Sequence, residues 1–250
     1  MNSPRFSLLS LNLWKTERWA DREKTVVSFL KIYEPDICCF QELQPATVPV
    51  LDNALPGYSR VEDSFRGWKT EGNIYFKNRF FREIEHGAVP LDMPEKDRRL
   101  FWVRLETIGG HRPLFVSTVH FTHQENADEM ATGVSYRHNE AVLAARALAD
   151  IVPKDEAAFV AGDFNDPIHP ARILSSAGFS EVFNSLGLLP PVTFPSQPIT
   201  DEIFMNEAID KIMVKGPVKP LLAAVPRYYA HGFPLSDHWP VMAFFELSAF

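Results

Sequence analysis

The sequence has little of several features that mark particular classes of protein. It contains only two cysteines, the adjacent Cys38 and Cys39. Neighbouring residues of a strand point to opposite faces of a sheet, so we expect two buried thiols and no disulfide framework. No run of eighteen or more apolar residues is present, and we therefore expect no membrane span. These absences indicate a fold that depends on a packed hydrophobic core.

Positively charged residues are also fewer than negatively charged ones. The chain has 250 residues, with 25 lysine and arginine residues against 32 aspartate and glutamate residues, and its formal net charge is −7. Proteins that bind long duplex DNA usually carry a basic face, because neutralisation of phosphates dominates their affinity. The acidic balance weighs against such a partner and favours ligands that are small or single-stranded.

The N-terminal segment lacks the features of a secretory leader. Residues 1–14 read MNSPRFSLLSLNLW, without a charged region followed by a long apolar stretch and a small-residue cleavage site. We expect a first β-strand here and a cytoplasmic protein.

Internal repeats, low-complexity tracts and linker-like segments are absent from the sequence. The one proline-rich stretch, residues 189–198, is too short to separate two domains, so we expect a single domain over residues 1–250. Strand-like apolar blocks with interspersed helical patterns predict an α/β layered domain rather than a barrel of strict βα units. The expected strands cover 6–13, 36–40, 72–77, 80–86, 99–106, 114–120, 157–162, 209–214 and 241–247, and the expected helices cover 18–33 and 135–151.

Chemically active side chains lie at the ends of these strands. Strand ends and the loops beyond them are where a rigid sheet presents side chains to a common cleft. Each position alone has an ordinary explanation: Asn12 suits a turn, Glu42 suits the start of a helix, and residues 162–165 (GDFN) suit a tight turn. Their joint placement favours a functional cleft. The set is Asn12, Gln41, Glu42, His120, Asp163, Asn165, Asp210, Asp237 and His238.

The residue types in this set suit the hydrolysis of phosphate esters. That reaction needs neutralisation of charge on the nonbridging oxygens, an oriented water and help for the leaving oxygen. Carboxylate and amide oxygens are hard ligands suited to Mg²⁺ or Mn²⁺, whereas zinc sites favour histidine and cysteine. A carboxylate beside a histidine stabilises the imidazolium, which can donate to phosphate. The sequence therefore predicts a metal-dependent phosphoric ester hydrolase.

In order and spacing, this set resembles the endonuclease/exonuclease/phosphatase superfamily, also called DNase I-like. The resemblance implies a four-layer sandwich of two packed mixed β-sheets flanked by helices, with a cleft at one end. Small bacterial members are the most similar group. The matching segments are QE at 41–42, GDFN at 162–165 and SDH at 236–238, together with Asn12, His120 and Asp210, and further similarities lie at Trp19, Arg22, 35–42, 71–80, His123 and Arg137.

The resemblance also implies the ligands of a metal ion and the group that activates water. Asn12 and Glu42 would hold the principal Mg²⁺ (or Mn²⁺), with Asp237 nearby. Asp163 would orient or deprotonate the attacking water, and Asn165 would steady both Asp163 and the phosphate.

Two histidines complete the implied site. His238, paired with Asp210, would bind phosphate and stabilise the transition state, and His120 would do so from the opposite wall. We therefore expect the Asp210 carboxylate within hydrogen-bond reach of the His238 ring.

Three segments depart from the family pattern. Lys211 stands where an aromatic residue commonly follows the aspartate, and residues 86–98 lack the WLSETP-like segment of the small bacterial members. Residues 41–44 read QELQ, where the apurinic-site repair branch usually has QETK. Substrate specificity is therefore not carried over. Nucleotides or nucleic acids, phospholipid headgroups, and sugar or inositol phosphates remain open as substrates, and we expect a monomer.

Side chains outside the motifs add candidates for substrate binding. Arg137 suits a bidentate phosphate clamp, with a surface ion pair as the alternative. His123 is expected at the rim, and Trp68 is the aromatic residue favoured for substrate contact. Trp14 and Phe194 are further aromatic candidates for a groove. The charged run at 95–99 is typical of a solvated loop.

Two other functions fit parts of the sequence. A zinc hydrolase would use His120 and His123, with His138 or His169 as a third ligand, but the spacing is not the helical HExxH arrangement and no cysteine joins it. A non-catalytic binding module on the same fold is the second alternative. The complete set of acid, amide and histidine positions weighs against it.

Overall fold

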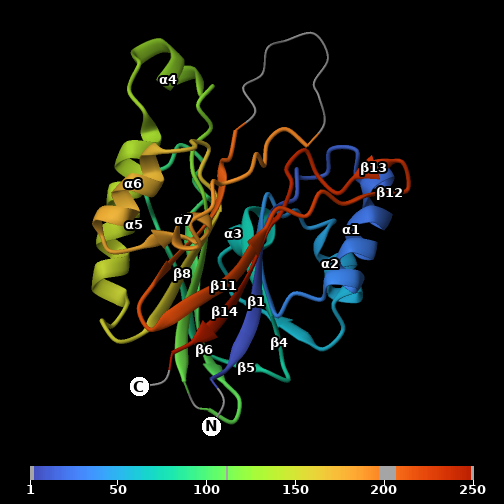
Figure 1. Cartoon of the computed structure of the whole chain (residues 1–250). Coiled ribbons are helices and arrows are strands. Elements are labelled where there is room, and N and C mark those ends of the chain that lie inside the picture. The colour runs from blue at the N-terminus through green and yellow to red at the C-terminus, as the bar shows by residue number, and fades with distance from the viewer. Residues whose placement is uncertain (1–2, 111, 197–206, 249–250) are drawn as a thin grey trace.

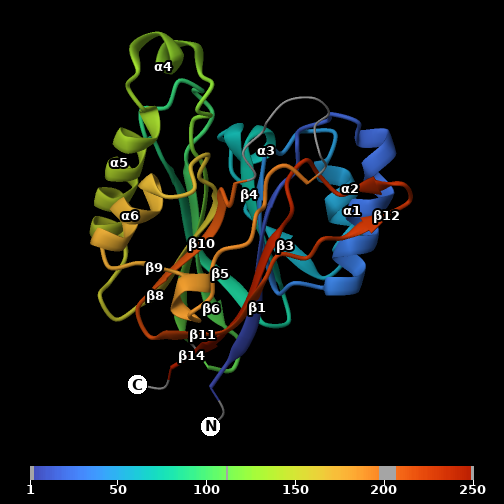
Figure 2. The same cartoon turned by 45° about the horizontal axis from the view of Figure 1, so that its top comes forward.

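Two six-stranded β-sheets pack face to face in the computed structural model, which describes residues 3–110, 112–196 and 207–248 (Figures 1 and 2). The first sheet contains both the N-terminal strand and the last strand of the chain. Its spatial order is β11 (Val218–Ala224), β14 (Val241–Leu247), β1 (Arg5–Asn12), β2 (Ile37–Gln41), β4 (Gly72–Lys77) and β3 (Tyr58–Arg60).

The second sheet is built mainly from the middle of the chain. In each sheet one strand pair is parallel, β1 with β2 in the first and β7 with β8 in the second, and the other pairs are antiparallel. The second sheet has the order β5 (Phe81–Val89), β6 (Leu100–Thr107), β7 (Pro113–His120), β8 (Ala157–Asp163), β10 (Asp210–Lys215) and β9 (Ser180–Glu181).

Helices cover both outer faces of the sandwich, which confirms the predicted four layers (Figure 1). No helix of the described ranges is long and apolar enough to cross a membrane. The first sheet is covered by α1 (Trp19–Tyr33) and α2 (Val48–Ala54), with the short strands β12 (Tyr229–Ala230) and β13 (Phe233–Pro234) beside them. The second sheet is covered by α5 (Tyr136–Ile151) and α6 (His169–Ser176). Three further helices are short: α3 (Gly67–Thr70), α4 (Ala127–Thr132) and α7 (Val182–Ser185).

Side-chain alternation along the strands divides the core into three apolar clusters. In β1, Leu8 faces the second sheet whereas Leu9 faces α1 and α2. The two adjacent thiols follow the same rule: Cys38 lies under the helices, Cys39 lies between the sheets, and both are free and buried. The prediction for the cysteines is confirmed. A third cluster joins the second sheet to α5 and α6.

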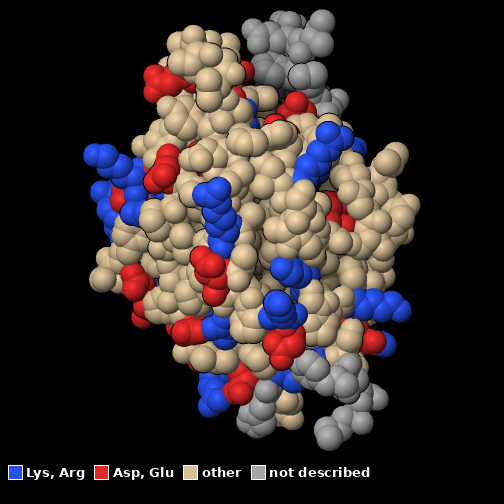
Figure 3. Space-filling model, turned by 90° about the vertical axis from the view of Figure 1, so that its left-hand side faces the viewer, with Lys and Arg blue, Asp and Glu red and all other residues tan. Residues whose placement is uncertain are grey.

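The predicted strands and both predicted helices are present, with ends that differ by a few residues. The strand β11 was not predicted, because Pro220 interrupts it and it lies at the edge of its sheet, where proline is tolerated. On the side formed by α5 and α6, basic and acidic groups are interspersed rather than gathered by sign (Figure 3). This side therefore has no extended basic surface.

Candidate active site

Strand pairing brings the predicted catalytic side chains to one end of the sandwich. Asn12 and Gln41 are register partners at the carboxyl ends of β1 and β2, and His120 and Asp163 are register partners at the ends of β7 and β8. Strand β10 runs antiparallel to β8 and starts at Asp210, the register partner of Asp163. Backbone pairing, rather than flexible loops, therefore positions these five residues.

Gly162 allows the close approach of β7 and β8 beneath this site. Its φ is +150°, and a Cβ atom built on it would lie 1.9 Å from the carbonyl oxygen of Val119. Only glycine fits without a backbone shift. The glycine of the GDFN motif thus sets the spacing between His120 and Asp163.

The strand ends border a cleft with a cavity volume of about 400 Å³. It mixes carboxylates, histidines, two amides and two aromatic side chains, Trp14 and Phe194. Eight of the eleven predicted site residues line it: Asn12, Glu42, His120, His123, Asp163, Asn165, Asp237 and His238.

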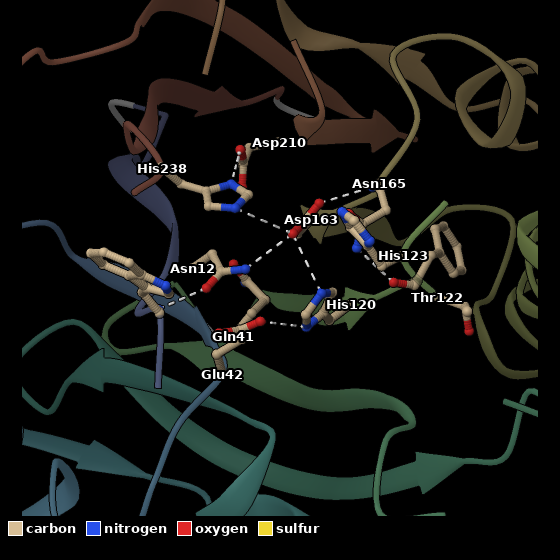
Figure 4. A network of polar contacts seen from close by, with 12 residues as sticks. Asn12, Gln41, Glu42, His120, Thr122, His123, Asp163, Asn165, Asp210 and His238 are labelled. Atoms are coloured by element: carbon tan, nitrogen blue, oxygen red, sulfur yellow. Dashed lines mark hydrogen bonds and ion pairs between the residues drawn. The ribbon is translucent and has the colours of Figure 1, made fainter. Parts of the chain in front are cut away.

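Asp163 lies at the centre of the polar network (Figure 4). Its side chain accepts hydrogen bonds from Asn12 Nδ2 at 3.0 Å and from the Asn165 backbone N–H at 2.8 Å. Nε2 of His120 lies 3.4 Å from Asp163 Oδ2, and Nε2 of His238 lies 3.8 Å from it. Burial raises the pKa of Asp163 to about 7, while the positive charge of His238 acts in the opposite direction. Such a carboxyl group can exchange a proton near neutral pH.

Asp210 and His238 form the predicted pair. Nδ1 of His238 lies 2.8 Å from Asp210 Oδ2, so this prediction is confirmed. Burial lowers the pKa of His238, but the carboxylates of Asp210, Asp237 and Asp163 outweigh it and hold the pKa well above its ordinary value. His238 is therefore an imidazolium at neutral pH, and its Nε2–H points toward Asp163 (Figure 4).

His120 has the opposite protonation state. Burial, followed by the positive charges of Arg98, His238 and Lys15, lowers the pKa of His120 well below its ordinary value. Its Nδ1 is buried without a hydrogen-bond partner in the described part of the chain and lies 4.0 Å from Glu42 Oε1. The two histidines beside Asp163 thus differ in charge, one neutral and one cationic.

Backbone strain is concentrated at the cleft. Within the described ranges, eight non-glycine residues have positive φ, and four of them line the cleft: Trp14 (φ 54°), Lys15 (44°), Glu42 (54°) and Asn165 (49°). Such conformations cost about 1–3 kcal/mol each and persist where the surroundings enforce them, often at functional sites. The strain supports a functional role for these positions.

Glu42, Asp237 and Asn12 offer hard oxygen atoms on the cleft wall. Burial raises the pKa of Glu42, and the negative charge of Asp237 raises it further. The amide of Asn12 donates to Asp163, and its Oδ1 accepts the Trp14 backbone N–H at 2.9 Å, which leaves one lone pair. This donor set fits a hard divalent cation, which would relieve the repulsion between the two carboxylates.

Asp163, Asp210 and His238 form another group whose ligand atoms lie within 4.8 Å of one another. In this group, however, the His238 ring already pairs with Asp210, and Asp163 already accepts two hydrogen bonds. The polar atoms of this group are therefore already engaged in hydrogen bonds within the protein.

The structure corrects two predicted substrate contacts. Trp68 is 1% exposed, packs on Phe101 in the core between the sheets and does not line the cleft. Arg137 is also buried: its Nη1 donates to the Thr122 carbonyl at 2.8 Å, and its Nη1 and Nη2 both pair with Glu129. Its guanidinium therefore joins α5 to α4 instead of clamping a phosphate.

The charged run at 95–99 is a third correction. Arg98 is 7% exposed and lines the cleft together with Glu95, so the segment is not simply a solvated loop. Lys15 also lines the cleft and was not predicted. A lysine or arginine in a loop gives no local signal of such a position, because burial against another segment is not visible in the sequence. His123, in contrast, is exposed at the cleft as expected.

The sandwich and its set of acid, amide and histidine residues define the class of phosphoester hydrolases. The chain belongs to the Endonuclease/Exonuclease/phosphatase family, whose model matches residues 9–238. Among curated proteins, no sequence matches this chain.

Solved structures with the same fold have low sequence identity to this chain. An endonuclease/exonuclease/phosphatase from Bacteroides vulgatus is 20% identical with a TM-score of 0.81, covering 98% of this chain and 100% of that one. D. rerio TDP2 complexed with a single-strand DNA product is 20% identical with a TM-score of 0.79, and the match covers 97% of this chain and 99% of that one. A mannosyl-6-phosphatase from Bacteroides thetaiotaomicron is 19% identical with a TM-score of 0.77, and the match covers 95% of this chain and 98% of that one. These similarities support the fold.

Replacement of Asp210 with asparagine is expected to lower the pKa of His238, because it removes the strongest carboxylate effect on that ring. The basic limb of the kcat/KM pH profile should move to lower pH, and the rate at pH 8 should fall by at least about tenfold. The exposed Asp150→Asn serves as the charge-matched control. An unchanged basic limb in D210N would show that the pair does not control the charge of His238.

Proposed function

We propose that this protein is a Mg²⁺-dependent phosphoesterase that hydrolyses phosphodiester or phosphomonoester bonds with an activated water. The observation that carries the proposal is the environment of Asp163. A carboxyl group with a pKa of about 7 lies between a neutral His120 and a cationic His238. This arrangement suits a general base beside two groups that hold a phosphate.

In the proposed reaction, Asp163 accepts a proton from water as the water oxygen attacks phosphorus. The bond from phosphorus to the leaving oxygen breaks, and the leaving group takes a proton from solvent. The Nε2–H of His238 and the side-chain amide of Asn165 donate to nonbridging oxygens. Asn165 Nδ2 already donates to the Phe121 carbonyl at 2.8 Å, which fixes its orientation and leaves its second N–H for substrate.

Glu42, Asp237 and Asn12 are the proposed ligands of the metal ion. When bound, Mg²⁺ (or Mn²⁺) would neutralise charge on the phosphate and on the leaving oxygen. Burial and the negative charge of Asp237 raise the pKa of Glu42, whereas the positive charges of Lys15 and Arg98 act to lower it. A bound cation would act in the same direction as Lys15 and Arg98 and favour the carboxylate.

The cleft favours small or single-stranded substrates. A cavity of about 400 Å³ holds a ligand the size of a nucleotide or sugar phosphate. The solved structures of similar fold include a mannosyl-6-phosphatase and a TDP2 with a single-strand DNA product, so sugar phosphates and nucleic-acid ends are both proposed for testing. The monomeric state and the cytoplasmic location stay predictions.

The zinc alternative is disfavoured by the contacts of its proposed ligands. His138 Nδ1 lies 2.8 Å from His169 Nε2, so these two rings pair with each other. Neither His123 nor His120 belongs to a group of three metal-binding side chains within the described residues. A non-catalytic module is disfavoured because the full set of acid, amide and histidine side chains is assembled around Asp163.

The direct test is a hydrolysis screen with Mg²⁺ or Mn²⁺ against an aryl phosphodiester, an aryl phosphomonoester and labelled oligonucleotides. We expect turnover of at least one substrate, its loss in EDTA and its recovery on addition of Mg²⁺ or Mn²⁺. The expectation follows from the hard oxygen ligands on the cleft wall. Full activity in excess chelator would remove the metal from the mechanism, and recovery by Zn²⁺ alone would favour the zinc alternative.

A further inference from the structure

Two positively charged side chains line the cleft without a part in the proposed reaction. They are Lys15, in the loop after β1, and Arg98, in the loop between β5 and β6. They are the two lysine or arginine residues among those that line the cleft. Both lie close enough to Glu42 and His120 to lower the pKa of each. The cleft therefore carries fixed positive charge next to the proposed metal ligand.

Lys15 is held at the cleft by a strained loop. Trp14 and Lys15 both have left-handed backbone conformations, and three contacts maintain them. The Trp14 N–H donates to Asn12 Oδ1 at 2.9 Å, its carbonyl accepts from Arg22 Nη2 at 3.3 Å, and the Arg22 guanidinium lies 5.1 Å from its ring centroid. Lys15 itself has no hydrogen bond or ion pair within the described ranges, and its ammonium group is available to a ligand.

Arg98 is buried but only loosely paired. Its Nε lies 3.3 Å from Glu71 Oε2 and its Nη1 lies 3.8 Å from Glu95 Oε2, and neither carboxylate binds it in a forked, two-bond arrangement. Its Nη2 has no partner among the residues that the structure describes. An arginine of this kind keeps part of its planar donor edge for an oxyanion, whereas Nη1 and Nη2 of Arg137 already donate to Glu129 and Thr122.

Carboxylates near Lys15 and Arg98 limit which anions this part of the cleft would bind. Glu17 and Glu95 also line the cleft, and Glu95 compensates one edge of Arg98. A single weak anion would gain little at Arg98, because Glu95 partly screens its charge. A group with two negative charges that contacts both Lys15 and Arg98 would gain more.

We propose that Lys15 and Arg98 form a subsite for a second phosphate group of the substrate, beside the phosphate that is hydrolysed. The preferred substrates are then phosphate esters that carry a further phosphate, as nucleoside bisphosphates and sugar bisphosphates do. This inference rests on the proposed function for the position of the hydrolysed phosphate. Arg98 supplies planar hydrogen-bond donors and Lys15 supplies a mobile point charge.

The test compares ligands that differ by one phosphate. Isothermal titration calorimetry in the presence of Ca²⁺ measures the affinity for each ligand. The affinity for thymidine 3′,5′-bisphosphate is compared with that for thymidine 5′-monophosphate, and the affinity for fructose 1,6-bisphosphate with that for fructose 6-phosphate. We expect the wild type to bind the bisphosphate about tenfold more tightly in at least one pair, as one charged hydrogen bond implies. The pair that shows the preference identifies the source of the second phosphate.

In Lys15→Ala and Arg98→Gln the ratio of the two affinities should fall to within about twofold of unity. Lys219→Ala, an exposed lysine on β11, removes the same charge away from the cleft and should keep the wild-type ratio. Because Lys15 is exposed and unpaired, its variant tests the subsite even if the Arg98 variant does not fold.

Equal affinities within both pairs for the wild type, including no measurable binding, overturn the subsite, as does a preference that survives both substitutions. Binding is measured without turnover, so the outcomes separate. A bisphosphate preference in a protein that hydrolyses no ester would leave the subsite standing and remove the proposed function. Hydrolysis without the preference would do the reverse.

Discussion

Replacement of Asp163 with asparagine is expected to reduce kcat by about 10²–10⁴-fold, the range typical of a lost general base. Asparagine keeps the size of the side chain and an acceptor oxygen for the Asn12 or Asn165 donor, but it has no basic charge. KM should change little, because His120, His238 and Asn165 remain to hold the phosphate. Steady-state kinetics on an aryl phosphodiester measure both constants.

The stability of the same variant is expected to stay level or rise, although its kcat falls. Burial raises the pKa of Asp163 to about 7, above its ordinary value of 3.8, so the folded protein binds the proton more tightly than the unfolded chain does. The resulting stabilisation is fully present below the unfolded pKa and is lost as pH rises through about 7. D163N should therefore be as stable as the wild type or more stable, with a larger gain in melting temperature at pH 8 than at pH 5.

Asp166→Asn is the matched control, because Asp166 lies three positions away and accepts the backbone N–H groups of Ile168 and His169, a role that asparagine also fills. It should retain most of the activity. If GDFN were only a turn held by an aspartate cap, D163N would melt at a lower temperature and keep a near-normal kcat. That result would end the assignment of Asp163 as the base.

The site was predictable from the sequence where it depends on strand ends. Apolar runs define the strands, and Asn12, His120 and Asp163 directly terminate three of them. Once β1 pairs with β2 and β7 with β8 in parallel, the ends of the strands coincide. The contact between Asp210 and His238 depends on tertiary structure, and family resemblance rather than periodicity supplied it.

The errors concern side chains whose surroundings come from distant segments. Trp68 lies in the polar stretch SFRGWKTEG, which suggests exposure, but the short helix α3 turns its ring onto Phe101 of β6. Arg137 has its partner on α4, a helix that the sequence pattern did not reveal, because it has six residues and no buried side chain. Periodicity reports the burial of regular elements and carries no information on such pairings.

Glu42→Gln is expected to weaken Mg²⁺ binding and to lower turnover at low millimolar Mg²⁺ by about two orders of magnitude, since loss of even a supporting group around a metal costs about 10–100-fold. Glu42 adopts a left-handed backbone conformation with φ of 54°, where glycine would be less strained, and it presents its carboxylate to the cleft. Metal titrations of activity and direct calorimetry with Mn²⁺ measure the loss of affinity.

The fold should not suffer from this substitution, and that separates a ligand from a structural charge. The Glu42 carboxylate makes no hydrogen bond within the described residues, and burial and the negative charge of Asp237 raise its pKa, so a neutral amide relieves repulsion in the metal-free protein. Thermal unfolding in EDTA should give an equal or higher melting temperature. Glu17→Gln, which removes another carboxylate from the same cleft, should leave the Mg²⁺ dependence within about twofold of the wild type. If E42Q and E17Q behave alike in both measurements, Glu42 is only a charge at the start of the following loop, and the metal has other ligands.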